Sequence, residues 1–257
     1  MGLVVLLIIA IGVTFMVLER IIPDQELSEV PGWWMRVIFL NVLQLGVVFL
    51  GGITWEHWFV GHSVLSLNES SIYMQVLVAY LLITFVFYFW HRARHEINIL
   101  WLTCHQLHHS PSRIETITSF YKHPVELIAN GIIIVFLNYA ILGISAEAGA
   151  WTTFVTAMAE FFYHMNIRTP HWVGYFLQRP EMHRIHHERD RHYYNFADLP
   201  VWDMIFGTYQ NPPHFAGPCG FKPEREESFW RMLSFRNVNN AFPAKSWWRK
   251  RNKLGEK

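Results

Sequence analysis

Histidine is concentrated in one part of this 257-residue chain, since twelve of its fifteen histidines lie between residues 91 and 192. Eight of them form three groups with short spacings, HRARH, HQLHH and HRIHH. The groups contribute His91 and His95, then His105, His108 and His109, then His183, His186 and His187. Residues i, i+3 and i+4 of a helix lie close together on its surface, so each group is predicted to point its imidazoles the same way.

Two copies of HxxHH have no explanation in side-chain packing, because three adjacent imidazoles repel one another once protonated. A bound metal supplies a reason, since neutral imidazole is a favoured ligand of zinc, iron, copper and nickel. His164, with Glu160 one helical turn before it, follows an apolar run and adds a ninth donor. Nine donors exceed the needs of one four-coordinate ion, which predicts two metal ions.

Other metal and hydrolase motifs are absent. His95 and Glu96 are followed by Ile97, Asn98 and Ile99, so no His-Glu-x-x-His zinc protease motif is present. The chain has no CxxC pair for a zinc finger or iron–sulfur cluster and no GxSxG hydrolase elbow. A membrane cytochrome needs only one pair of facing histidines per haem, which leaves the doublets unexplained.

The composition indicates the kind of scaffold that holds these histidines. Hydrophobic residues make up 52% of the chain and charged residues 16%, which excludes intrinsic disorder. Ordinary glycine content and two cysteines exclude collagen-like and disulfide-stapled folds. The formal net charge of +1 provides no basic field for nucleic acid, so no nucleic-acid partner is expected.

Five apolar runs are predicted to form membrane helices, because about 20 apolar residues are needed to cross a bilayer. They cover residues 3–18, 37–53, 73–90, 127–144 and 148–163. So many runs in one short chain favour membrane spans over buried helices of a soluble core. The first lacks the charged start and cleavage site of a signal peptide, and the last two are predicted to form a hairpin. The predicted fold is an all-α polytopic membrane protein with about four to five membrane helices and a cytoplasmic helical metal-binding cap.

The basic residues predict the orientation of this single domain, residues 1–257. All 21 lysines and arginines fall in the first connection, in the third, or after the fifth run. The positive-inside rule then places the histidine groups and the C-terminus in the cytoplasm and the N-terminus on the opposite side. Cys104 and Cys219 lie on that reducing side, so no disulfide is expected. The basic, aromatic tail, residues 244–257, is predicted either to contact anionic lipid headgroups or to be solvated.

The three histidine groups, placed after membrane runs, resemble the boxes of the fatty acid hydroxylase/sterol desaturase superfamily, which comprises membrane-bound histidine-rich di-iron oxygenases. Two further segments carry the resemblance: HHSPSRIETITSFYKHPVE, which includes His123 to Glu126, and NFADLPVWDMIFGTY, residues 195–209. The resemblance covers the histidine-box region, residues 88–209. The sequences HRARHEINILW and HHS lean toward an alkylglycerol or generic bacterial-type branch.

The resemblance implies a non-haem di-iron centre that activates O2. Matching motif positions implies nine ligands: His91, His95, His105, His108, His109, His164, His183, His186 and His187. Some relatives have a histidine where this chain has Glu160, which is open to three interpretations: ligand, hydrogen-bond partner of an imidazole, or helix-end residue. Six residues are candidate additional ligands or hydrogen-bond partners of ligands: Glu160, His123, His192, Glu126, Asp190 and Asn195. An alternative role for His123 is a cap of the fourth predicted span, before Pro124.

No catalytic residue separate from the metal ligands is predicted. The expected reaction is O2-dependent hydroxylation of a C–H bond in a membrane lipid of fatty acyl, sterol or alkylglycerol type. A desaturase using the same site is the alternative, and a non-enzymatic metal-binding or transport protein is a remote one. A transporter carries ionisable residues within its spans, whereas here only Glu160 lies in a run.

The resemblance also implies cofactors and partners. Two iron ions are expected, although zinc also suits imidazole ligands and can occupy a purified sample. No glycine loop for a nucleotide or flavin is present, so electrons are expected from a separate reductase, ferredoxin or cytochrome. The sequence gives no prediction of oligomeric state.

Overall fold

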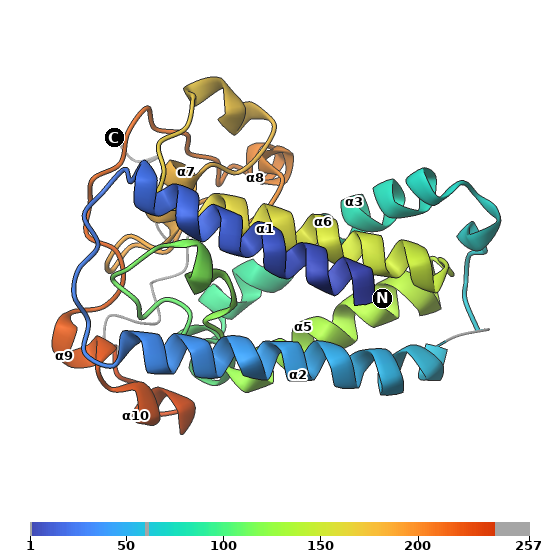
Figure 1. The fold of residues 1–257 in the computed structure, drawn as a ribbon, viewed down its shortest axis with the longest axis horizontal. Helices are drawn as coiled ribbons and strands as arrows, with labels where there is room; N and C mark the ends of the chain where they lie inside the picture. Colours follow the sequence, from blue (N-terminus) through green and yellow to red (C-terminus); the bar gives the residue numbers. More distant parts are fainter. Residues whose placement is uncertain (1, 60–61, 240–257) are drawn as a thin grey trace, which may run out of the picture.

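Five long helices form the body of the molecule in the computed structural model, which describes residues 2–59 and 62–239 (Figure 1). They are α1 (Gly2–Ile21), α2 (Trp33–Phe59), α3 (Ile72–Glu96), α5 (Pro124–Val135), which continues as the π-helical η4 (Phe136–Ile141), and α6 (Ala146–His164). The described residues contain no β-strand. The all-α fold class is therefore confirmed, whereas the C-terminal tail lies outside the described residues.

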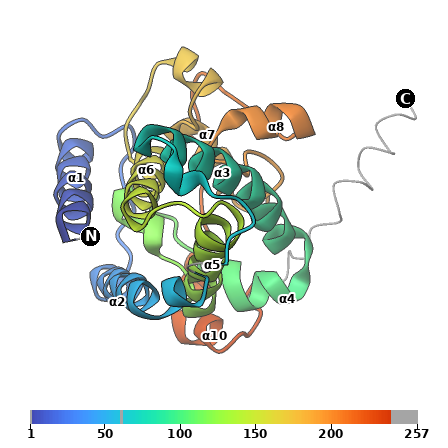
Figure 2. The same ribbon diagram turned by 90° about the vertical axis from the view of Figure 1, so that its right-hand side faces the viewer.

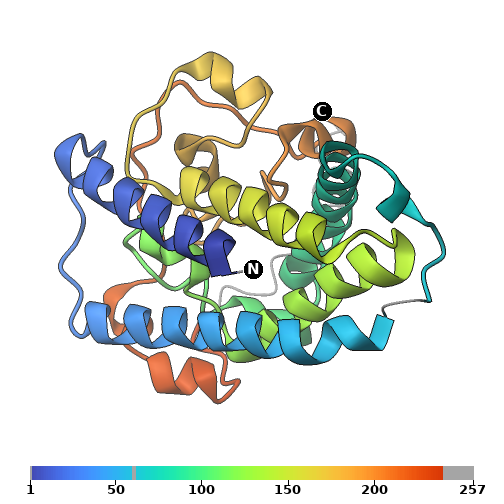
Figure 3. The same ribbon diagram turned by 45° about the vertical axis from the view of Figure 1, so that its right-hand side comes forward.

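Four helical segments are long and apolar enough to cross a membrane: Gly2–Ile21, Trp33–Gly51, Ile72–Glu96 and Pro124–Ile141. The fifth predicted run forms α6, which is less apolar because it contains Glu147, Glu160 and several threonines. In two views α6 lies between α1 and α3, and it packs along both of them (Figures 2 and 3).

Local signals in the sequence account for the starts of three helices. The Ser71 hydroxyl accepts a hydrogen bond from the Met74 amide at the start of α3. Ser145 does the same for Ala148 in α6. Serine is a favoured residue at this position because its side chain satisfies an amide that has no partner within the helix. Helix α5 begins with Pro124 at its first position, where the missing amide proton is not needed.

A cap of short helices and loops, residues 97–123 and 165–239, covers one end of the long helices (Figure 1). Its short helical segments are α4 (Asn98–Leu100), η2 (Trp101–His105), η3 (Thr116–Phe120), η5 (His171–Tyr175), α7 (Pro180–His186), α8 (Pro200–Phe206), α9 (Pro223–Glu226) and α10 (Phe229–Leu233). An apolar cluster joins the cap to α2 and includes Trp33, Leu40, Trp101 and Met232. Burial of each such side chain contributes about 1.5–3 kcal/mol.

Buried polar contacts fix the end of α1 to this cap. The Glu19 carboxylate, which is fully buried, accepts hydrogen bonds from the backbone amides of Thr116 (2.9 Å) and Asn166 (3.0 Å). Thr116 and Asn166 belong to the two separate segments of the cap. One carboxylate therefore holds α1 against both segments, and the cap histidines are positioned on a rigid base.

Candidate metal centre

Nine histidines, eight of them buried, form two clusters where the cap meets α3 and α6. Within each cluster one potential ligand nitrogen per ring lies within 4.8 Å of the others. The five-histidine cluster contains His91, His95, His105, His109 and His186. The four-histidine cluster contains His108, His164, His183 and His187. The structure therefore brings together all nine histidines that the resemblance implied as ligands.

The expectation that each HxxHH group points its three imidazoles the same way is wrong. In HQLHH the first and last histidines join the five-histidine cluster and His108 joins the other. In HRIHH the first and last join the four-histidine cluster and His186 joins the other. HRIHH begins in α7, and an α-helix turns about 100° per residue, so positions i and i+4 lie about 40° apart while i+3 lies about 60° from i on the opposite side. HQLHH begins at the last residue of the π-helical η2 and continues as a turn, and it divides its histidines in the same way. Each group therefore serves two sites.

Backbone carbonyls orient four of the imidazoles. The bonds run from His91 Nδ1 to Phe196 O (2.7 Å), His186 Nδ1 to Tyr194 O (2.8 Å), His164 Nδ1 to Glu160 O (2.8 Å) and His108 Nδ1 to Tyr121 O (3.3 Å). A carbonyl oxygen only accepts, so each Nδ1 carries the proton and each Nε2 keeps a lone pair. Partners of this kind fix the tautomer of metal-binding histidines.

A buried carboxylate orients a fifth imidazole. Both oxygens of Glu126, which is fully buried, lie 3.2 Å from Nδ1 of His105. The Arg94 guanidinium forms an ion pair with the same carboxylate. Removal of a charge from water is costly unless it is paired, so Arg94 allows Glu126 to remain ionised beside His105. Glu126 was a predicted hydrogen-bond partner, whereas nothing in the sequence distinguished Arg94.

The residues present fit a metal-binding site. Buried ring nitrogens without a hydrogen-bond partner among the described residues occur in both clusters, including Nε2 of His91, His105 and His186 and Nδ1 of His187. In the four-histidine cluster, Nε2 of His183 lies 3.0 Å from Nε2 of both His164 and His187. Each unpartnered buried polar group costs about 1–3 kcal/mol, a cost that a shared cation removes.

The protonation state also suits metal binding. Burial, followed by the neighbouring imidazoles, lowers the pKa of His109, His183 and His187 well below its usual value. Burial lowers the pKa of His186 to about 3. These imidazoles are therefore neutral at pH 7, the form that binds transition metals.

Glu160 and His123 are placed differently from the nine histidines. The Glu160 carboxylate pairs with Lys122 (Nζ to Oε2, 2.7 Å), and its backbone oxygen accepts the hydrogen bond from His164. His123 caps α5, as the alternative expectation had it: Nδ1 accepts from the Val125 amide (3.1 Å). Neither side chain belongs to a histidine cluster.

The three remaining candidates lie in the loop after α7. His192 sits beside the five-histidine cluster, with its ring centroid 4.7 Å from that of His109. Asp190 adopts the left-handed conformation, with φ of 60°. The Asn195 side chain binds backbone groups of Met182 and Gln210 rather than an imidazole, which corrects the predicted role of Asn195.

Asp203 helps to position the metal site, although the sequence did not indicate this role. Its carboxylate accepts hydrogen bonds from the amides of Phe196 (2.8 Å) and Ala197 (2.9 Å) and from the Thr208 hydroxyl (2.6 Å). These bonds hold the segment whose Phe196 carbonyl orients His91. Asp203 and Thr208 lie in the segment NFADLPVWDMIFGTY, so the motif had marked the right region without indicating this function.

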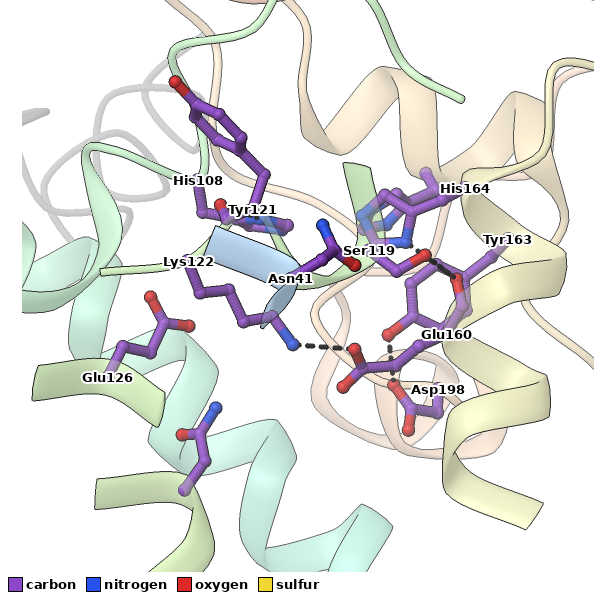
Figure 4. A network of polar contacts seen from close by, with 12 residues as sticks. Asn41, His108, Ser119, Tyr121, Lys122, Glu126, Glu160, Tyr163, His164 and Asp198 are labelled. Atoms are coloured by element: carbon purple, nitrogen blue, oxygen red, sulfur yellow. Dashed lines mark hydrogen bonds and ion pairs between the residues drawn. The ribbon is translucent and has the colours of Figure 1, made fainter. Parts of the chain in front are cut away.

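A cavity of about 360 Å³ adjoins both clusters on the membrane side. His91, His105, His108, His164 and His183 line one end of it. Apolar side chains of α1, α2 and α5 line much of the remainder. Figure 4 shows the polar contacts near His164: Lys122 faces Glu160, and the Tyr163 hydroxyl donates to Asp198 (3.0 Å).

Comparisons with known proteins show which proteins this chain is similar to. Over 136 residues, 51% of this chain, the sequence is 31% identical to alkylglycerol monooxygenase of Homo sapiens. It is 32% identical over 147 residues, 54% of the chain, to ornithine lipid hydroxylase of Rhizobium tropici. It is 24% identical over 139 residues to a very-long-chain aldehyde decarbonylase of Oryza sativa subsp. indica, covering 52% of this chain and 54% of that protein. The chain spans 30% of the human protein and 43% of the rhizobial one.

No solved structure matches this chain. The model of the fatty acid hydroxylase family matches residues 76–208, just over half of the chain. That range contains most of α3, all of α5 and α6, and all nine clustered histidines. The chain belongs to the fatty acid hydroxylase family.

Proposed function

We propose that this protein is an O2-dependent hydroxylase of a membrane lipid, with one iron ion held by each histidine cluster. The observation that carries the proposal is the pair of imidazole clusters at the end of a largely apolar cavity between membrane helices. The alkylglycerol monooxygenase and the ornithine lipid hydroxylase bear names that describe oxidation of lipids, which supports the same reaction class. A fatty acyl, sterol or alkylglycerol lipid is the proposed substrate.

Bound iron supplies the activation of O2 and the oxidation of an unactivated C–H bond. The protein supplies the geometry. Carbonyl oxygens and Glu126 keep Nδ1 of five imidazoles protonated and direct Nε2 toward the clusters. Phe196, which is buried, packs against the rings of His91, His95 and His186 and helps to exclude water from the five-histidine cluster.

Electrons are proposed to come from a separate protein that docks on the cap. Several arginines lie in the cap, and the proposed orientation places this end of the molecule in the cytoplasm. A reductase, ferredoxin or cytochrome provides the two electrons that reduction of O2 requires alongside a hydroxylation. Measurement of the product formed with each of these electron donors compares them directly.

The test combines metal analysis with isotope labelling. Protein reconstituted with iron under anaerobic conditions is given a reductase, a lipid extract and ¹⁸O2. We expect ¹⁸O in a lipid product, and we expect His108→Ala and His186→Ala each to lower turnover by at least about 10³-fold and to reduce bound iron. His171→Ala, an exposed histidine outside both clusters, is the control and retains activity.

Full activity in both His108→Ala and His186→Ala contradicts the proposal. A new double bond without ¹⁸O in the lipid assigns the site to a desaturase instead. Tight zinc with no iron-dependent oxidation, together with metal uptake into proteoliposomes, favours the non-enzymatic alternative.

A further inference from the structure

The cavity beside the clusters is open toward the side of the helix bundle. Helix α1 packs along α6 and α2 packs along α5, and in the described residues no comparable packing joins α1 to α2 (Figure 2). Val13 of α1 and Leu45 of α2 both line the cavity, and they remain 54% and 46% exposed. Both lie within helices that can cross a membrane. The gap between α1 and α2 therefore faces the bilayer.

The outer part of the cavity suits a hydrocarbon chain. Its lining on α1 extends from Val4 to Met16, which at 1.5 Å per residue corresponds to about 18 Å. All but one of the α1 residues along it are aliphatic or Met, the exception being Gly12. The direction of α1 is also the direction in which the chains of bilayer lipids extend. A single alkyl chain can lie along this surface without leaving its usual orientation.

The inner end of the cavity is polar, but its basic side chains are already paired with carboxylates and are not available to an anionic headgroup. The two basic residues that line the cavity are both paired, Lys122 with Glu160 and Arg94 with Glu126. Asp198 accepts from the Tyr163 hydroxyl, and burial raises the pKa of Asp198 to about 7, so its charge is reduced. A phosphate therefore finds no unpaired lysine or arginine among the described residues that line the cavity.

Hydrogen-bond acceptors are present at the same end. Gln44 lies one turn of α2 beyond Asn41, and both line the cavity. The Oε1 atom of Gln44 is buried and has no hydrogen-bond partner among the described residues. Buried acceptors are nearly always satisfied, and a hydroxyl group of a bound molecule satisfies this one. Asn41 and Glu160 approach the same space (Figure 4).

From these features, and resting on the proposed function, we infer that a bilayer lipid enters sideways between α1 and α2. Its uncharged, hydroxyl-bearing head group lies at the end formed by Lys122 and Glu160, and its alkyl chain lies along α1. The carbons next to the head group, rather than those deep in the chain, then face the histidine clusters. The site thus selects lipids with a small neutral polar head over phospholipids.

The experiment is photo-crosslinking of the metal-loaded, full-length protein in nanodiscs. The probe is hexadecylglycerol with a diazirine in its alkyl chain, and the comparison probe carries the same chain on a phosphocholine head. We expect the neutral probe to label cavity residues of α1 and α2 at least about fivefold more than the phosphocholine probe. Glu160→Gln leaves Lys122 unpaired, so it lowers this preference at least about threefold.

Matched variants test the route of entry. Val13→Trp and Leu45→Trp fill the gap and lower cavity labelling at least about fivefold. Val17→Trp and Leu50→Trp change residues of the same types on the same helices, 52% and 54% exposed, that do not line the cavity. These two controls retain labelling within about twofold. Unchanged metal content establishes that each variant is folded.

Equal labelling by the two probes, or full labelling in both Val13→Trp and Leu45→Trp, overturns the inference. Oxidation of a lipid at a carbon far from its head group also overturns it, while leaving the hydroxylase function intact. Cavity labelling as expected, without ¹⁸O in any lipid, overturns the proposed function and leaves sideways lipid uptake standing.

Discussion

The two histidine clusters both draw on HQLHH and HRIHH, but α3 contributes only to the five-histidine cluster and α6 only to the four-histidine cluster, and their surroundings differ. Three of the four rings in the four-histidine cluster line the cavity, against two of five in the other. In the five-histidine cluster, Phe196 and Trp101 pack against the ring of His95. The comparison indicates that the four-histidine cluster presents more of its rings to the cavity, whereas the five-histidine cluster has more aromatic side chains packed against it.

The clusters also differ in how their imidazoles are held. The four-histidine cluster uses the carbonyls of Tyr121 and Glu160. The five-histidine cluster uses the carbonyls of Tyr194 and Phe196 and, in addition, the ionised Glu126. Among the described residues, a charged partner therefore orients an imidazole only in the five-histidine cluster. Substitutions in these partners should affect the clusters unequally.

The largest unequal effect is expected for Glu126→Ala. This change removes the acceptor of His105 and leaves Arg94 as an unpaired buried cation, which costs about 3–5 kcal/mol of folding free energy. Loss of such a partner also lowers metal affinity by about 10–100-fold. Thermal unfolding and competitive chelation measure the two effects, and the weakened ion is the one in the five-histidine cluster.

Glu224→Ala removes an exposed carboxylate of the cap and is the control for Glu126→Ala. Equal weakening of both metal ions by Glu126→Ala would show that the two clusters share their support.

An acid-dependent loss of stability is expected for the metal-stripped protein. Burial holds the pKa of His186 at about 3 and that of His108 well below its usual value, whereas these imidazoles titrate near pH 6.5 when unfolded. Below pH 6.5 the unfolded state binds protons that the folded state does not. The free energy of unfolding therefore falls by about 1.4 kcal/mol per pH unit for each such histidine.

Thermal unfolding between pH 7.5 and pH 5 measures how the free energy of unfolding depends on pH. Substitution of one clustered histidine by phenylalanine should lower this slope by the contribution of one histidine. A stability independent of pH over this range contradicts the burial of neutral imidazoles in both clusters.

The smallest effect is expected for Asp203→Asn. The amide that replaces Oδ2 cannot accept from the Ala197 amide, so about 1–3 kcal/mol of stability is lost. The loosened segment contains Phe196, whose carbonyl serves only the five-histidine cluster. Metal release from that cluster should accelerate, and release from the four-histidine cluster should not. Equal acceleration at both sites is the contrary outcome.

The sequence predicted the helical class and all nine clustered histidines because histidine spacing and apolar runs are local signals. It did not predict the division of each HxxHH group, because that depends on which elements lie on either side of a short helix. Glu160 could not be assigned for the same reason: its partner Lys122 is 38 positions away. Carbonyl partners such as Phe196 O are invisible to sequence reasoning, since every residue has a carbonyl.

The fold shows which end of the molecule carries the cap, but not which side of the membrane that end faces. The cap lies at one end of the long helices (Figure 1), and the clustered histidines come from the cap and from α3 and α6. Which side of the membrane this end faces stays a prediction. A cysteine-accessibility assay with a membrane-impermeant reagent, using a cysteine introduced at exposed Glu224, measures it.

The central claim is that each HxxHH group is shared between two metal sites. Iron per chain, measured in the parent protein and in two paired variants, tests it most directly. Two ions are expected in the parent, one in His105→Ala/His109→Ala and one in His183→Ala/His187→Ala, with the surviving ion in a different cluster in each variant. A single ion in the parent, or loss of all iron in both paired variants, would contradict it.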